Sequence, residues 1–163
     1  FKQKTAYEIT TRLVGSGDVY KRQVQAARIA ITGTQTMEDG GPQTLELVTD
    51  GSYCYEPGFA LLSYVESEMT GLEGVVTSFQ IEDGKTVTLR RSGKVNAEMV
   101  FDRRQAHESL YDVGFGAMMI SVVTEDMTVL LNEHGGVLDL DYRVEVEHAL
   151  CSRNRYHIEI QTI

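Results

Sequence analysis

In the stretch Leu138-Asp139-Leu140-Asp141-Tyr142-Arg143-Val144-Glu145-Val146-Glu147, apolar side chains alternate with charged ones without interruption. Successive side chains of a β-strand point to opposite faces, so this alternation predicts a strand with one buried and one solvated face. Tyr156, Ile158 and Ile160 repeat the pattern closer to the C-terminus. We therefore predict a C-terminal hairpin whose turn spans residues 151–154.

Similar strands are predicted along the rest of the chain. They cover residues 28–37, 43–56, 59–68, 75–82, 86–91 and 95–102. Turn-forming residues separate these strands at positions 38–42, at Pro57-Gly58, at Asp83-Gly84 and at Ser92-Gly93-Lys94. Residues 69–74 are predicted to be a looser connection.

A long apolar stretch begins at Ala117, and the phase of its apolar positions shifts between Thr124 and Met127. Such a shift predicts a β-bulge or a corner. Residues 127–133 would also suit a short helix. Their β-branched residues and the in-phase Leu131 favour a strand.

Many short strands without a long helical pattern predict an all-β domain, which is either a sandwich or a barrel. Because local hairpins join the strands, we expect antiparallel pairing between neighbours in sequence order. A closed antiparallel up-and-down β-barrel is favoured, since closure removes the exposed strand edges that invite aggregation.

Residues 1–23 are predicted to be a non-native, adapter-encoded segment. Phe1-Lys2-Gln3-Lys4-Thr5-Ala6-Tyr7-Glu8 is the translation of the start of a common sequencing primer, and residues 13–16 and 18–23 fit adjoining adapter DNA if one inserted base is allowed near Gly17. A native basic arm is the alternative. Such segments are set aside before fold reasoning. Residues 24–163 are then expected to form a single β-barrel domain on which residues 1–23 do not pack, with the true N-terminus lost.

Without residues 1–23 the chain is strongly acidic. The loss of five basic and two acidic residues leaves 10 basic and 22 acidic ones, and the formal charge changes from −9 to −12. Such a surface repels phosphate backbones, so no nucleic-acid partner is expected. No apolar run approaches the roughly 20 residues needed to span a bilayer, and no signal peptide is recognisable. We expect a cytoplasmic protein that does not enter a membrane.

The second half of the chain resembles a known family. The residues that carry the resemblance are Leu89-Arg90-Arg91-Ser92-Gly93, Phe101, Tyr111, Phe115-Gly116, Thr124, Gly135-Gly136 and Tyr142. They resemble the YwiB-like family of uncharacterised bacterial proteins, and the resemblance extends over residues 24–163. It implies a calycin-like or lipocalin-like barrel of about eight strands. It implies no catalytic residues and no cofactor.

Arg91 is the first candidate for a ligand-binding residue. The alternation of its strand places Arg91 on the apolar face with Val87 and Leu89, where an unpaired guanidinium is costly, so a partner is required. Arg91 would suit bidentate contact with the carboxylate or phosphate of a ligand at the barrel mouth. We favour a structural pairing with an internal acid or with turn carbonyls, because burial demands a partner and not a ligand.

Tyr111 and Tyr142 are the other candidate ligand-binding residues. Tyr142 lies on the apolar face of its strand, and Tyr111 precedes the segment Gly114-Phe115-Gly116. Hydroxyl groups in an apolar pocket can orient a ligand. Ordinary core packing with one satisfied hydroxyl is the favoured alternative. Barrels of this size are also often filled by their own side chains.

No catalytic residue and no metal site is predicted. His107, His134, His148 and His157 have no metal-ligand spacing with one another or with the cysteines. No positioned nucleophile is recognisable.

The remaining conspicuous residues have structural interpretations. Gly114-Phe115-Gly116 is interpreted as a turn, Met118 and Met119 as core filler, and the acidic positions of residues 138–147 as a solvated face. Cys54 and Cys151 are predicted to be reduced thiols.

Three functions are compatible with these observations. The favoured one is a barrel that binds a small apolar or amphipathic anionic ligand through Arg91 and Tyr142. The second is a cytoplasmic interaction or regulatory module whose acidic surface binds a basic protein. The third is an enzyme, which would need converging titratable groups in a cleft and is the least supported.

Overall fold

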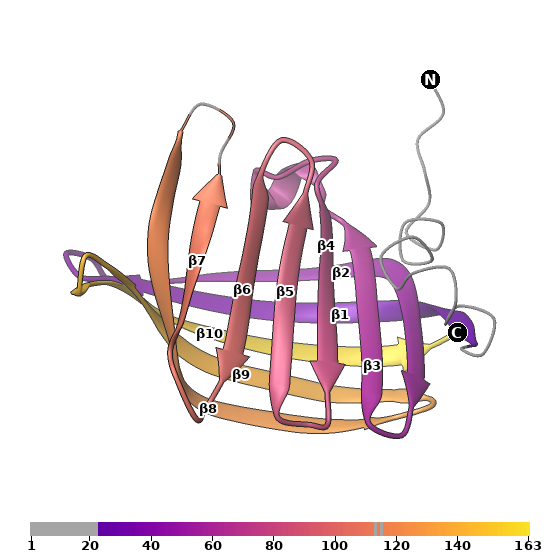
Figure 1. Cartoon of the computed structure of the whole chain (residues 1–163). Coiled ribbons are helices and arrows are strands. Elements are labelled where there is room, and N and C mark those ends of the chain that lie inside the picture. The colour runs from indigo at the N-terminus through magenta and orange to yellow at the C-terminus, as the bar shows by residue number, and fades with distance from the viewer. Residues whose placement is uncertain (1–22, 113, 115) are drawn as a thin grey trace.

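The computed structural model describes residues 23–112, 114 and 116–163. Within these residues the chain forms ten strands and a short 3-10 helix, η2 (Figure 1). The strands are β1 (Val24–Met37), β2 (Pro42–Glu56), β3 (Phe59–Val65), β4 (Val76–Glu82), β5 (Thr86–Ser92), β6 (Asn96–Asp102), β7 (His107–Asp112), β8 (Ala117–Asn132), β9 (Gly135–Val146) and β10 (Ala149–Thr162), and η2 (Glu68–Thr70) joins β3 to β4.

The strands form a closed barrel in which each strand pairs antiparallel with its neighbour in sequence and β1 pairs with β10. The predicted up-and-down barrel is confirmed. It has ten strands rather than about eight. One strand without a prediction is β7 (His107–Asp112), whose sequence His-Glu-Ser-Leu-Tyr-Asp has no regular alternation, and which pairs with β6 at only two positions.

The barrel consists of two crossing layers (Figure 1). Strands β3 to β7 run at a steep angle across β9, β10 and β1, while the long strands β2 and β8 contribute to both layers. In such arrangements the strands that change layer do so at bends or bulges. In β8 the register shifts between Thr124 and Asp126, which confirms the predicted bulge. The strand then continues to Asn132, so residues 127–132 are extended and not helical.

The predicted C-terminal turn was wrong. Residues 151–154 lie inside β10, and the hairpin turns instead at Glu147 and His148, which have positive φ angles of 53° and 66°. Turns of this kind prefer Asn and Gly, so Glu-His gave no turn signal. Strand β10 carries a bulge between Leu150 and Ser152. Cys151 therefore marks an irregularity in the strand and not its start.

The other turns follow the sequence more closely. Chain reversals occur at Gly58, at Asp83-Gly84 and at Gly93, each with a positive φ angle. The third predicted strand is shorter than expected and ends at Val65, because residues 68–70 form η2 in place of a looser connection. Gly114 also has a positive φ of 93°. Residues 1–22, which are all but one of the predicted adapter-encoded segment, lie outside the described residues, as do Val113 and Phe115.

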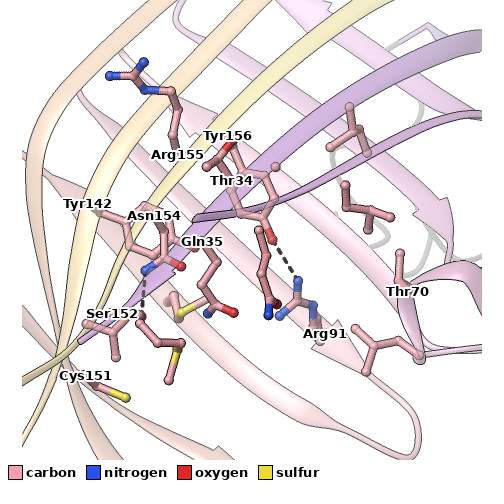
Figure 2. Close-up of a pocket in the computed structure, with 18 of the residues that line it drawn as sticks. Thr34, Gln35, Thr70, Arg91, Tyr142, Cys151, Ser152, Asn154, Arg155 and Tyr156 are labelled. Atoms are coloured by element: carbon pink, nitrogen blue, oxygen red, sulfur yellow. Dashed lines mark hydrogen bonds between the residues drawn. The ribbon is translucent and has the colours of Figure 1, made fainter. Parts of the chain in front are cut away.

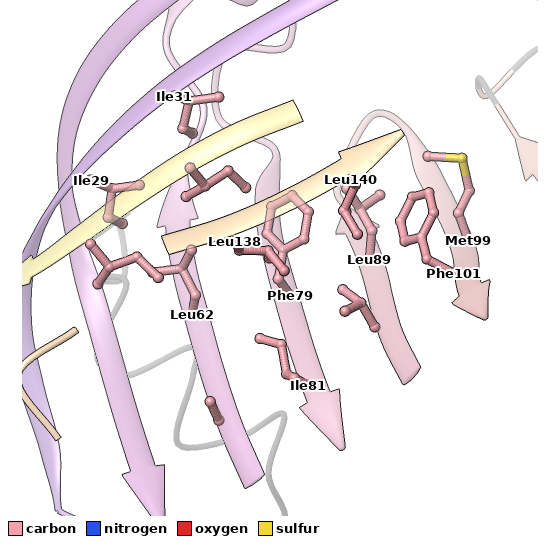
Figure 3. Close-up of a cluster of buried hydrophobic side chains, with 14 of the residues drawn as sticks. Ile29, Ile31, Leu62, Phe79, Ile81, Leu89, Met99, Phe101, Leu138 and Leu140 are labelled. Atoms are coloured by element: carbon pink, nitrogen blue, oxygen red, sulfur yellow. The ribbon is translucent and has the colours of Figure 1, made fainter. Parts of the chain in front are cut away.

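A hydrophobic core fills part of the barrel (Figure 3). Inward-facing side chains of both layers meet there, and among the largest that are fully buried are Ile29, Leu62, Phe79, Leu89, Phe101, Leu138, Leu140 and Ile158. Burial of each such aliphatic or aromatic side chain stabilises a fold by about 1.5–3 kcal/mol. Burial of the core therefore stabilises the closed barrel. No helix of the described residues is long and apolar enough to span a membrane.

Most charged side chains of β9 pair with neighbours on the outer surface. Arg155 binds Asp141 at 2.6 Å, and Arg143 binds Glu145 at 3.1 Å. His157 contacts Asp139 at 2.5 Å and Glu159 at 3.0 Å. Hydrogen bonds to Glu159 and Asp139 raise the pKa of the His157 imidazole above its ordinary value. The solvated acidic face is thus partly neutralised by basic groups of β9 and β10.

His157 is expected to make the stability of the barrel depend on pH. The pKa of His157 is raised in the folded state. The stabilisation that the protonated ring gives to the fold is therefore complete below about pH 6.5, the ordinary histidine pKa, and is lost as the pH rises through the pKa of the folded state. The ring is 39% exposed, so the effect should stay below about 1 kcal/mol. The free energies of unfolding of His157→Gln and wild type, measured with urea, should differ at pH 5.5 and become equal at pH 9. A difference that is independent of pH would contradict this assignment.

Candidate functional site

A cavity of about 640 Å³ lies at the part of the barrel that the core does not fill. Nearly every strand contributes to its wall, and η2 contributes Thr70 (Figure 2). The lining is mostly apolar and includes Ile31, Leu47, Met99, Ile120 and Val144. A few polar groups converge within it. This size and composition are typical of pockets that bind small molecules.

One cross-strand row of residues forms the polar side of the cavity. Tyr64 of β3 pairs with Thr77 of β4, Thr77 with Arg91 of β5, Arg91 with Ala97 of β6, and Ala97 with Tyr111 of β7. Directly paired residues point to the same face of a sheet. Ala97 is small, which allows the Arg91 and Tyr111 side chains to meet above it. The row explains why residues far apart in sequence converge.

Arg91 interacts with tyrosine hydroxyls rather than with an acid. Its Nη2 donates to the Tyr156 hydroxyl at 3.2 Å (Figure 2). Its Nη1 donates to the Tyr111 hydroxyl at 3.4 Å. Its Nε is buried and has no hydrogen-bond partner among the described residues. No carboxylate of the described residues forms an ion pair with Arg91. The internal acid or turn carbonyls expected from the sequence are therefore not its partners in the described part of the chain.

Tyr142 packs in the cavity wall. Its ring lies edge-on to Phe101 with a centroid distance of 4.6 Å and stacks with Tyr156 at 6.2 Å. Burial raises the pKa of the Tyr142 hydroxyl well above its usual range, so the group remains a neutral hydrogen-bonding group. Tyr142 and Tyr111 both line the cavity with Arg91. The three residues singled out from the sequence thus share one site.

Tyr156 is a site residue that the sequence analysis missed. The alternation of β10 placed Tyr156 on the inward face, but only the closed barrel brings it across the interior to Arg91. Gly33 of β1 pairs with Tyr156, and a Cβ at Gly33 would lie 3.3 Å from the Tyr156 ring. Glycine at this position therefore leaves room for the ring. The ring also packs edge-on against Phe79 from the opposite layer.

Glu66 is the second missed residue. Its side chain is buried at 5% exposure and lines the cavity. Thr77 donates a hydrogen bond to Oε1 at 2.8 Å, and Thr70 donates one to Oε2 at 2.9 Å. Sequence analysis placed Glu66 near the end of a predicted strand without a role. The sequence around Glu66, which continues with Ser67 and the residues of η2, contains no recognisable motif.

Other candidates have simpler roles. Met118 and Met119 are 51% and 55% exposed, so their interpretation as core filler was wrong. Both lie at the start of β8, and Met118 lines the cavity. Cys54 and Cys151 do not form a disulfide with each other, which agrees with the prediction of reduced thiols. Within the described residues, no group of three or more His, Cys, Asp or Glu side chains could hold a metal ion.

Comparison with known proteins places the chain in a family. The model of the domain of unknown function DUF1934 matches residues 29–158, which is most of the barrel. The chain belongs to the DUF1934 family. The crystal structure of the YwiB protein from Bacillus subtilis is similar to this DUF1934 domain, with a TM-score of 0.78, 20% sequence identity, and coverage of 91% of this chain and 99% of that one.

These findings confirm the resemblance to the YwiB-like family and the all-β barrel. At 20% identity the structural likeness shows the fold alone. A search of curated proteins gives no match for this DUF1934 domain.

Proposed function

We propose that this DUF1934 domain binds a small amphipathic anion, with the apolar part inside the barrel and the acidic group at Arg91. The supporting observation is a guanidinium in a cavity of about 640 Å³, whose buried Nε has no hydrogen-bond partner in the described part of the chain. Arginine remains charged at any physiological pH. A charge of this kind is costly to bury without a counterion.

The geometry of Arg91 favours an acidic group over a neutral one. Tyrosine hydroxyls use one hydrogen of Nη1 and one of Nη2, so several of the five guanidinium hydrogens remain available. A carboxylate or phosphate would accept two of them at once. The Tyr111 and Tyr156 hydroxyls would hold the guanidinium in place. Ile31, Leu47 and Val144 would contact the apolar part of the ligand.

Isothermal titration of the purified protein with decanoate tests this proposal. Decan-1-ol has the same alkyl chain without the charge and serves as the matched control. Decanoate is expected to bind with one-to-one stoichiometry and at least about tenfold more tightly, which corresponds to about 1.4 kcal/mol. Equal affinity for both compounds, or binding of neither, would refute the proposed role of Arg91.

The alternative of an acidic surface that binds a basic protein has less support. Glu125 is shared by Arg143 and Arg153 at 3.1 Å each, and Asp141 is bound by Arg155. These arginines bind the carboxylates of Glu125, Glu145 and Asp141 and so reduce the attraction of this part of the surface for a basic partner. Salt also screens the attraction between exposed charges on two proteins. We therefore place the function in the cavity and not on the outer face.

A further inference from the structure

Glu66 presents a second uncompensated charge to the same cavity. Both of its carboxylate oxygens accept hydrogen bonds from threonine hydroxyls, and the side chain is 5% exposed. No basic side chain of the described residues forms an ion pair with it. Hydroxyl groups reduce the cost of burying a carboxylate but do not neutralise it. As far as the described residues show, the site therefore contains an acid without a basic partner and a guanidinium without an acidic partner.

Glu66 and Arg91 belong to one structural unit. Thr77 donates its hydroxyl to Glu66 and pairs in the sheet with Arg91. The Tyr64 hydroxyl lies near both charges: burial raises its pKa well above the usual range, the Glu66 charge adds to the rise, and the Arg91 charge opposes it. Despite this proximity, Glu66 and Arg91 do not form an ion pair with each other.

Hydroxyl groups from different elements hold the two charges. Thr70 of η2 and Thr77 of β4 hold the two carboxylate oxygens from different elements, while Tyr111 and Tyr156 hold the guanidinium from β7 and β10. Two threonine hydroxyls thus hold the carboxylate, and two tyrosine hydroxyls hold the guanidinium.

We propose that the ligand is zwitterionic: an anionic group binds Arg91 and a cationic group, such as an ammonium, binds Glu66. This inference rests on the proposed function and specifies its ligand class. A ligand with both groups neutralises both buried charges at once, whereas a simple anion leaves Glu66 unpaired and is repelled by it. The apolar wall of the cavity then accommodates the chain between the two groups.

A series of ω-amino acids tests the inference. Each compound, H₃N⁺-(CH₂)n-COO⁻ with n from 3 to 11, is titrated calorimetrically beside the straight-chain carboxylate of the same carbon number. At one chain length the amino acid is expected to bind about tenfold more tightly than its matched carboxylate. In Glu66→Gln this advantage should fall to less than about twofold, while the carboxylate binds equally well or better because the repulsive charge is gone.

Glu68→Gln is the matched control, since Glu68 is an exposed acid of η2 and should leave the advantage unchanged. Glu66→Asp gives a second readout that does not depend on tolerance of glutamine. It keeps the charge but withdraws it by one methylene, so the preferred ligand should become longer by one carbon. A merely structural role of Glu66 would not shift the preferred length.

The outcomes separate the two proposals. Carboxylates that bind with Arg91-dependent affinity, but without any advantage for an amino acid of any length, would overturn the zwitterion and leave the anion site standing. An advantage that persists in Glu66→Gln would overturn the role of Glu66. If neither class of compound binds to the wild-type protein, the proposed function fails and the inference fails with it.

Discussion

Arg91→Met is expected to weaken decanoate binding by about 100-fold, while the ligand-free barrel becomes as stable as wild type or up to about 2 kcal/mol more stable. The two effects have one cause. Arg91 brings a charge into the cavity without a carboxylate partner among the described residues, so it contributes to binding and costs stability. A factor of 100 corresponds to about 2.7 kcal/mol, within the range for removing one partner of a buried charge pair.

Methionine is the appropriate replacement because it has a similar length and no charge. Its flexible thioether can fill the space beside Ala97 and Tyr111. The Tyr111 and Tyr156 hydroxyls lose a donor each, at a cost of about 1 kcal/mol per hydrogen bond at most when water can replace it. Removal of a buried charge offsets this cost.

Decanoate titration and urea unfolding measure the two effects. Arg90→Met is the control: Arg90 is the adjacent residue, lies on the outer face and binds Glu98 at 3.1 Å, so decanoate affinity should stay within about twofold of wild type. A large loss of stability in Arg91→Met combined with unchanged decanoate binding would show that Arg91 is a structural residue. That result would support the interpretation that the sequence alone favoured.

Much of the fold could be predicted because strand alternation is a local property. The alternation of residues 138–147 identified β9 and its inward face, including Tyr142. The phase shift near Thr124 identified the bulge at which β8 changes layer. Each of these features depends only on the order of neighbouring residues in the sequence. Glu147 and His148 were missed as a turn because their backbone conformation is imposed by the hairpin and not by their own preferences.

The site was only half predictable because it depends on register and closure. Arg91 was conspicuous as a cation on an apolar face, whatever its neighbours. Tyr156 and Glu66 become site residues only when β10 reaches across the barrel and when Thr77 is aligned with Arg91. A shift of one residue in the register of β4 would turn Thr77 to the other face. Sequence patterns give the face of a residue but not its partners across a closed barrel.

Gly51→Ala is expected to destabilise the barrel by about 3 kcal/mol, near the upper end of the usual cost of overpacking. Gly51 lies where β2 stops pairing with β1 alone and begins to pair with β3. A Cβ at this position would lie 2.2 Å from the Ser63 carbonyl oxygen and 2.7 Å from Cδ1 of Ile29. A backbone atom cannot move away without disturbing the β2–β3 pairing, so the corner between the two layers must open.

Urea unfolding should show the loss of Gly51 as a fall in the midpoint of about 1.5 M, for a slope of about 2 kcal/mol per M. Gly41→Ala is the matched control, because a Cβ at Gly41 would meet nothing within 4 Å; its midpoint should stay close to that of wild type. Glycine in a strand interior otherwise weakens the strand. If Gly51→Ala were as stable as wild type, the close approach of β2 to Ser63 would not be a constraint on the corner, and β2 would have to change layers by another route.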